Sequence, residues 1–109
     1  MEPPFQPLRI PAGWTVTYTK LREIDPADVR GDDRCFHLDQ DLLQMRHDRP
    51  KRLLDVGWYW SDDTVGAYGV VLYDDVPQGK LLFEHHTPSC SELVAEVERL
   101  LQEVSEGRL

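Results

Sequence analysis

Cysteine and long apolar runs are both scarce in this sequence. Its 109 residues include two cysteines, and no apolar run approaches the roughly 20 residues that a membrane-spanning helix needs. The first residues have neither the basic segment nor the apolar core of a secretory signal peptide. Cys35 and Cys90 lie far apart, in no metal-binding spacing. We therefore expect reduced thiols, no membrane span and a cytoplasmic location.

Positive charge is also in short supply. Twelve Lys and Arg face 20 Asp and Glu, which gives a formal net charge of −8. A negative field of this size repels phosphate backbones, so we expect no nucleic-acid partner. It favours a basic protein partner by steering the encounter, although it also keeps a small domain in solution whatever the domain binds.

Sequence signatures of catalysis are missing. There is no glycine-rich phosphate loop, no nucleophile elbow, and no Ser or Cys beside an obvious base. His85 and His86 with Cys90 make a poor metal site, because neighbouring strand residues point to opposite faces and zinc takes four ligands. We expect no enzymatic activity, cofactor or metal.

One acidic residue keeps an enzymatic alternative open. Asp55 lies within an apolar strand pattern, where burial could make it a general acid or base. The other interpretation is that Asp55 faces solvent or pairs with Arg46 or Arg52. A small metal-dependent enzyme that uses Asp55, His85 or His86 is therefore the alternative to a binding protein.

Proline marks the start of the chain. Residues 1–13 hold four of the eight prolines, and proline cannot donate a ladder hydrogen bond, so residues 1–12 are expected to form an extended arm. The length fits a single domain over residues 1–109.

Alternating apolar and polar residues predict strands at 14–19, 53–60, 65–73 and 80–85. In the first, Trp14, Val16 and Tyr18 are expected on one face and three threonines on the other. In the second, the apolar face carries Leu54, Val56, Trp58 and Trp60.

Helical spacing occurs in two places. Residues 36–45 suit a short helix, with a bent strand as the alternative. Near the C-terminus, Ser89 and Glu92 match a capping box, an amphipathic stretch follows, and Gly107 stops it. Together these patterns predict an α+β fold, in which an antiparallel meander of about four strands carries the short helix and packs the C-terminal helix on one face.

Aromatic and acidic residues gather at the predicted turns. Asp32-Asp33, Asp62-Asp63 and Asp74-Asp75 fit turn chemistry rather than a calcium loop. Exposed aromatics flanked by acids suit a basic partner, whereas the same aromatics could form the core. The partner-binding residues predicted on this basis are Tyr59, Trp60, Asp62, Asp63, Asp74 and Asp75.

Two segments also carry a resemblance to a known class. The run Ile10-Pro11-Ala12-Gly13-Trp14-Thr15-Val16-Thr17-Tyr18, together with Leu53-Leu54-Asp55-Val56-Gly57-Trp58-Tyr59, the meander and the helix near Ser89, resembles the small immunity-type proteins of bacterial polymorphic toxin systems. The resemblance implies an acidic inhibitor that neutralises a toxin by covering it, and it transfers no binding residues. The alternative is a structural subunit or a homodimer formed through an exposed strand edge.

Overall fold

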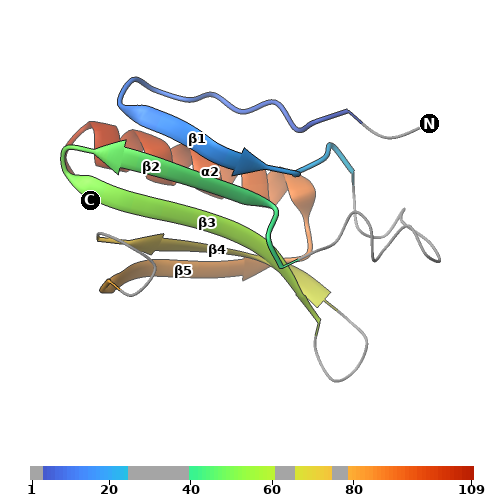
Figure 1. The fold of residues 1–109 in the computed structure, drawn as a ribbon. Coiled ribbons are helices and arrows are strands. Elements are labelled where there is room, and N and C mark those ends of the chain that lie inside the picture. Colours follow the sequence, from blue (N-terminus) through green and yellow to red (C-terminus); the bar gives the residue numbers. More distant parts are fainter. Residues whose placement is uncertain (1–3, 25–39, 61–65, 75–78) are drawn as a thin grey trace.

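The computed structural model describes residues 4–24, 40–60, 66–74 and 79–109. In these residues five strands form one antiparallel sheet in the order β1-β2-β3-β4-β5, and one long helix covers one of its faces (Figure 1). The elements are β1 (Trp14–Thr19), β2 (Leu43–Asp48), β3 (Lys51–Trp60), β4 (Gly66–Tyr73), β5 (Leu81–Thr87) and α2 (Cys90–Ser105). The predicted α+β meander is confirmed, with one strand more than expected.

The additional strand, β2, corrects the helix predicted over residues 36–45 and agrees, from residue 43 onward, with the strand given as its alternative. Residues 43–48 pair with β3 in full register, from Leu43 opposite Val56 to Asp48 opposite Lys51. Leu43, Met45 and His47 are buried while Gln44, Arg46 and Asp48 are not, which is the two-residue period of a strand. Helical spacing misled here because Leu42 and Leu43 are both buried, which hides the alternation. Residues 36–39 lie outside the described part.

The core lies between α2 and the facing side of the sheet. Alternate residues of β3 and β4 point to the helix and are fully buried, as the apolar face of residues 53–60 predicts. Trp58 packs edge to face on Tyr68, with ring centroids 5.0 Å apart. From α2 the buried side chains are Leu93, Val97, Leu100, Leu101 and Val104.

The helix begins and ends where its sequence signals predict. Ser89 is the N-cap, and its side chain accepts a hydrogen bond from the Glu92 N–H. The helix ends at Ser105, and Gly107 beyond it has a φ of 80°.

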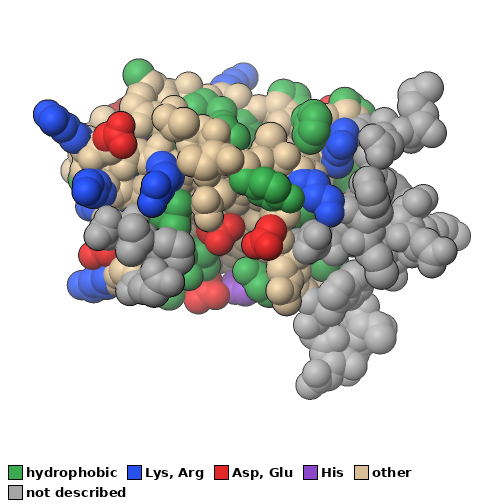
Figure 2. All heavy atoms as spheres, viewed as in Figure 1, with side chains coloured by type: hydrophobic (Ala, Val, Ile, Leu, Met, Phe, Trp, Pro, Cys, Tyr) green, Lys and Arg blue, Asp and Glu red, His purple; other side chains and the backbone are tan. Residues whose placement is uncertain are grey.

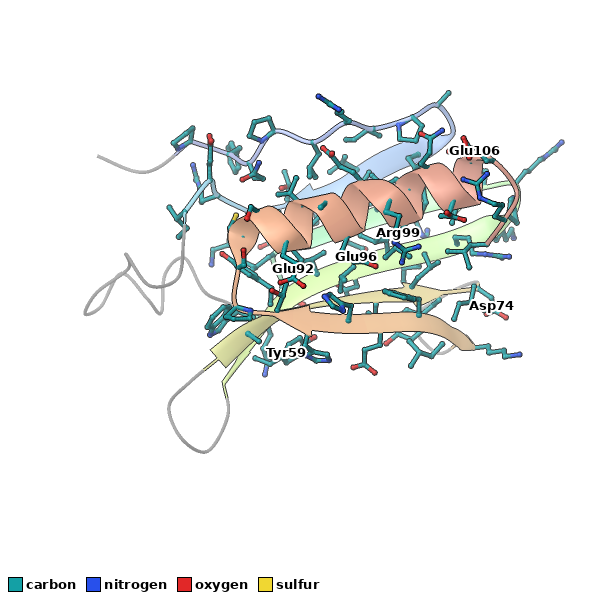
Figure 3. The ribbon with its side chains drawn as sticks, turned by 180° about the vertical axis from the view of Figure 1, so that it is seen from behind. Tyr59, Asp74, Glu92, Glu96, Arg99 and Glu106 are labelled. Carbon is teal, nitrogen blue, oxygen red and sulfur yellow. The ribbon has the colours of Figure 1, made fainter. Side chains whose placement is uncertain are left out.

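The proline-rich arm is fastened to the helix rather than to the sheet centre. Its described part runs beside β1 and α2 (Figures 1 and 3). The Arg9 N–H donates to Glu98, 2.8 Å away, and the Ser105 hydroxyl donates to the Ala12 carbonyl. Next to the arm, the Trp14 indole N–H donates to the Leu101 carbonyl at 3.0 Å. These bonds leave the other face of the sheet uncovered by either element.

Candidate functional site

The sheet face turned away from α2, here called the open face, carries the polar and aromatic side chains that have no place in the core. From the strand registers it holds Tyr18, Gln44, Arg46, Asp55, Tyr59, Glu84 and His86. Figure 2 views this face and shows acidic side chains close together near its middle, Lys and Arg toward its two ends, and further acidic side chains at the left end and along the lower edge. The centre of this face is therefore acidic, while its ends carry charges of both signs.

A β-bulge places Tyr18 on the open face. Val16 pairs with Met45 and Tyr18 pairs with Gln44, so Thr17 is an additional residue between them. Because each residue of a strand reverses the direction of its side chain, this insertion moves Tyr18 away from the face of Val16. The prediction that Trp14, Val16 and Tyr18 share one face is thus wrong at Tyr18, whose side chain is 45% exposed.

The bulged residue also fixes its neighbour across the strand pair. The Thr17 hydroxyl lies 3.1 Å from both the backbone carbonyl and the side-chain Oε1 of Gln44. This contact restrains the Gln44 side chain on the open face, beside Tyr18 and Asp55.

A glycine in β3 lets the chain bring a second carboxylate to Asp55. A Cβ atom on Gly57 would lie 2.0 Å from the Gln40 carbonyl oxygen, so only glycine admits the Gln40 backbone here. Leu42 then donates its N–H to the Val56 carbonyl and buries its side chain in the core. Asp41, held between these two anchors, lies close enough to Asp55 to affect its ionisation.

Four residues from three segments line a hollow on the open face. Tyr18, Asp41, Gln44 and Asp55 border this hollow, which is open to solvent and has a volume of about 410 Å³. Burial raises the pKa of Asp55, the Asp41 carboxylate raises it further, and a hydrogen bond from the Val56 backbone opposes both. Among the described residues, no Lys, Arg or His forms an ion pair with either carboxylate.

Next along β3 an exposed tyrosine is braced against its neighbours. Tyr59 is 43% exposed and lies across Gly69, where a Cβ atom would approach its ring to 2.9 Å. The His86 ring lies beside it, with centroids 6.2 Å apart, and His86 pairs with Glu84 at 2.8 Å. Partial burial raises the pKa of Tyr59, and Asp55 is the next cause. A braced aromatic loses little conformational entropy when it is covered.

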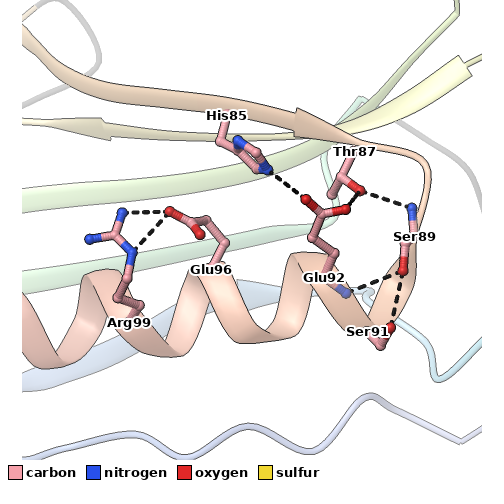
Figure 4. Close-up of polar contacts among 7 residues, drawn as sticks. All are labelled: His85, Thr87, Ser89, Ser91, Glu92, Glu96 and Arg99. Atoms are coloured by element: carbon pink, nitrogen blue, oxygen red, sulfur yellow. Dashed lines mark hydrogen bonds and ion pairs between the residues drawn. The ribbon is translucent and has the colours of Figure 1, made fainter.

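The carboxylates on the helix side are, by contrast, already satisfied within the chain (Figure 4). Glu92 accepts from the Thr87 hydroxyl at 2.6 Å and lies 3.4 Å from His85. Glu96 pairs with Arg99. Similarly, Arg108 pairs with Glu103 and Glu106, and Glu98 accepts from the arm.

The structure separates the residues predicted to bind a partner. Tyr59 lies near the start of β4, opposite Ala67, whereas Asp74 follows the end of β4 (Figure 3). Asp74 closes the turn toward β5, because its carboxylate accepts from the Lys80 N–H at 2.8 Å. The remaining members, namely the side chain of Trp60 and residues Asp62, Asp63 and Asp75, lie outside the described part.

The residues of the enzymatic alternative are also dispersed. His85 reaches toward Glu92 on the helix side, while His86 and Asp55 face the open side. Within residues 4–24, 40–60, 66–74 and 79–109, no group of three or more His, Cys, Asp and Glu side chains could hold a metal ion. Neither Arg46 nor Arg52 forms an ion pair with Asp55, and Arg52 instead donates to the Lys51 and Asp74 carbonyls.

Of the residues that form the hollow, the sequence singled out only Asp55. Tyr18 was assigned to the other face because nothing in the sequence marks the bulge, and Asp41 and Gln44 fell within the predicted helix. A glycine inside an apolar strand was the one available signal of a close backbone approach, and Gly57 is such a residue.

Comparison of the chain with protein-family models, with curated proteins and with solved structures gave no match. In the described residues, no helix combines the length and apolar character needed to cross a membrane.

Proposed function

We propose that this chain is a small binding protein that neutralises a basic protein, in the manner of an immunity protein that blocks a toxin, and that its open face forms the contact. The observation that carries the proposal is the difference between its two sides. Carboxylates on the helix side have partners within the chain, while Asp41 and Asp55 have no cationic partner among the described residues.

An uncompensated carboxylate that is partly buried costs free energy in the isolated protein. A cation supplied by a partner would offset that cost and would gain from the lowered local dielectric. The exposed Tyr18 and Tyr59 border the same region and supply apolar area, of the kind that dominates the energetics of protein interfaces. Acidic charge and exposed aromatic rings on one face therefore favour a basic protein surface.

A second copy of this chain fits this face less well. Two copies would each carry a formal charge of −8, so two open faces brought together would repel. The edge of β5 is a different route to a homodimer, and it leaves the open face available.

The proposal is tested by capture and by a functional readout together. The tagged chain is used to isolate partners from its native cell, and the candidate partner is then purified and titrated by calorimetry at several salt concentrations. We expect a basic partner, one-to-one binding that weakens as salt rises, and loss of the partner's toxicity when both proteins are co-expressed.

Matched variants decide whether the open face is responsible. Tyr59→Ala should weaken binding by at least about tenfold, as expected for an interface aromatic. Glu96→Gln removes one negative charge on the helix side and should leave the affinity within about twofold. Equal effects of the two substitutions, or a partner that binds without loss of its toxicity, would overturn the proposal.

A further inference from the structure

We propose that the hollow lined by Tyr18, Asp41, Gln44 and Asp55 receives the guanidinium group of one arginine side chain from the bound partner. This inference rests on the proposed function and adds the chemistry of its central contact. It makes the hollow the specific anchor of an otherwise broad surface.

The charge of the hollow calls for a cation. Asp41 and Asp55 approach it from different segments, and neither has a cationic partner among the described residues. Arg46 lies two residues beyond Gln44 on the same strand, yet it forms no ion pair with Asp55. A neutral or anionic group in this place would leave the negative charge of the two carboxylates uncompensated.

The lining favours guanidinium over ammonium. The acceptors around the hollow are two carboxylates and the Gln44 Oε1, spread over β2, β3 and the segment before β2. A guanidinium presents five N–H donors in one plane and can address acceptors on several sides, while an ammonium presents three donors around one point. The Tyr18 ring adds an aromatic wall on which a planar cation stacks.

Two departures from regular strand geometry and one side-chain hydrogen bond converge on this place. The bulge at Thr17 turns Tyr18 to the open face, the Thr17 hydroxyl fixes Gln44, and Gly57 admits the backbone that carries Asp41. Bulges are common where a strand must re-aim a side chain beside a functional site. An acidic turn of the ordinary kind needs none of these devices.

Proton linkage gives the contact a pH dependence. Burial and the Asp41 carboxylate raise the pKa of Asp55, and a hydrogen bond from the Val56 backbone lowers it. Arg46, Tyr59 and Glu84 are the other charged or titratable groups of the strands that share the open face with Asp55. A guanidinium beside Asp55 favours the charged carboxylate, so binding expels any proton that Asp55 still holds. The affinity for arginine should therefore rise as the pH increases through the pKa of Asp55 and then level off.

The test uses the whole chain and a defined probe. ¹⁵N-labelled protein is titrated with N-acetyl-arginine methylamide, with the neutral citrulline counterpart and with the lysine counterpart, all at matched ionic strength. Amide shifts of residues 18, 41, 44 and 55 report on the hollow. We expect saturable shifts with the arginine probe, at least about tenfold weaker binding of citrulline, and weaker binding of lysine than of arginine.

Variants exclude a merely electrostatic attraction to an acidic protein. Asp55→Asn and Tyr18→Leu should each weaken binding of the arginine probe severalfold. Glu96→Gln, with the same change in charge as Asp55→Asn, should leave this binding unchanged. The spectra themselves show whether each variant is folded, and Tyr18→Leu changes an exposed side chain only.

The outcomes separate this inference from the proposed function. Citrulline or lysine binding as well as arginine, or arginine shifts that avoid the hollow, would overturn the arginine assignment. If Tyr59→Ala still weakens binding of the purified partner while Asp55→Asn does not, the open face is the interface but the hollow is not its anchor. If no basic partner binds and the arginine probe still saturates the hollow, the site stands and the inhibitor function fails.

Discussion

Tyr18 lies opposite Gln44 in the β1–β2 register, and this pairing puts its ring on the open face although Val16, two residues earlier, points to the helix side. The cause is the single additional residue, Thr17. One inserted residue thereby moves a large aromatic side chain from the core side to the surface, next to two carboxylates.

Tyr18→Ala is expected to separate binding from stability. The side chain is 45% exposed, so its removal should lower the free energy of unfolding by less than about 1 kcal/mol. Partner affinity should fall by about tenfold or more, because the ring borders the proposed contact. Val16→Ala is the matched control, since Val16 is 41% exposed on the same strand and faces the other side. Equal losses of affinity in both variants would contradict a role for the open face.

Gly57→Ala should damage both the fold and the hollow. The new Cβ would lie 2.0 Å from the Gln40 carbonyl oxygen, a backbone atom that cannot rotate away. We expect a loss of about 1–3 kcal/mol in unfolding free energy, as for other overpacked positions, together with amide shifts at Asp41. Gly107→Ala is a useful comparison because no atom lies within 4 Å of its new Cβ, so its cost of about 1–2 kcal/mol comes only from the φ of 80°, and it should leave Asp41 unmoved.

The sequence predicts the architecture better than the site, for a physical reason. The strands predicted at 14–19, 53–60, 65–73 and 80–85 correspond to β1, β3, β4 and β5 of the structure, and the capped C-terminal helix corresponds to α2. They follow from periodicity, which is a property of many residues together. The hollow depends on one insertion at Thr17 and on one close approach at Gly57, and neither changes the average pattern. Asp55 was identifiable because a carboxylate in an apolar strand departs from that pattern. Asp41 lies near Asp55 only because Gly57 lets the Gln40 backbone approach β3 closely.

The aromatic residues show the same difference between what the sequence predicts and what only the structure decides. Sequence alone left core and interface as equal interpretations for them. Burial separates them, since Trp14, Trp58 and Tyr68 are in the core while Tyr18 and Tyr59 are exposed. Whether each ring is buried or exposed depends on the face of the sheet to which its strand position points. The alternation of the sequence could not reveal the bulge that turns Tyr18 to the open face.

Asp55→Asn is expected to raise stability at neutral pH and to flatten its pH dependence. The pKa of Asp55 is raised in the folded protein by burial and by Asp41. A raised folded pKa means that protonation favours folding, so this contribution is fully present below the ordinary pKa of 3.8 and is lost as the pH rises through the folded value. Urea unfolding at a series of pH values measures the slope. Glu96→Gln is the control for the change in charge. If Asp55→Asn were less stable than the parent at pH 7, the Asp55 carboxylate would have a stabilising partner in the folded protein, contrary to our interpretation.

Thr87 links the sheet to the helix start, and Thr87→Val tests that link. Its hydroxyl donates to Glu92 at 2.6 Å and accepts from the Ser89 N–H at 3.1 Å, so the predicted capping box is closed through a third residue (Figure 4). Thr87 is 2% exposed, and valine of the same shape would leave both groups without this partner, at a cost of about 1–3 kcal/mol. Thr87→Ser keeps the hydroxyl and should lose less.

The same hydroxyl sets the acid sensitivity of this junction. Its hydrogen bond is the main cause that lowers the pKa of Glu92, and His85 adds to it. A lowered folded pKa stabilises the protein above the ordinary glutamate pKa, and the contribution is lost as the pH falls through the folded value. Thr87→Val should therefore shrink the loss of stability on acidification, while Thr87→Ser should preserve it, as followed by thermal unfolding between neutral pH and the acid limit. If valine and serine gave the same acid profile, Glu92 would not be held by Thr87, and the cap would rest on Ser89 alone.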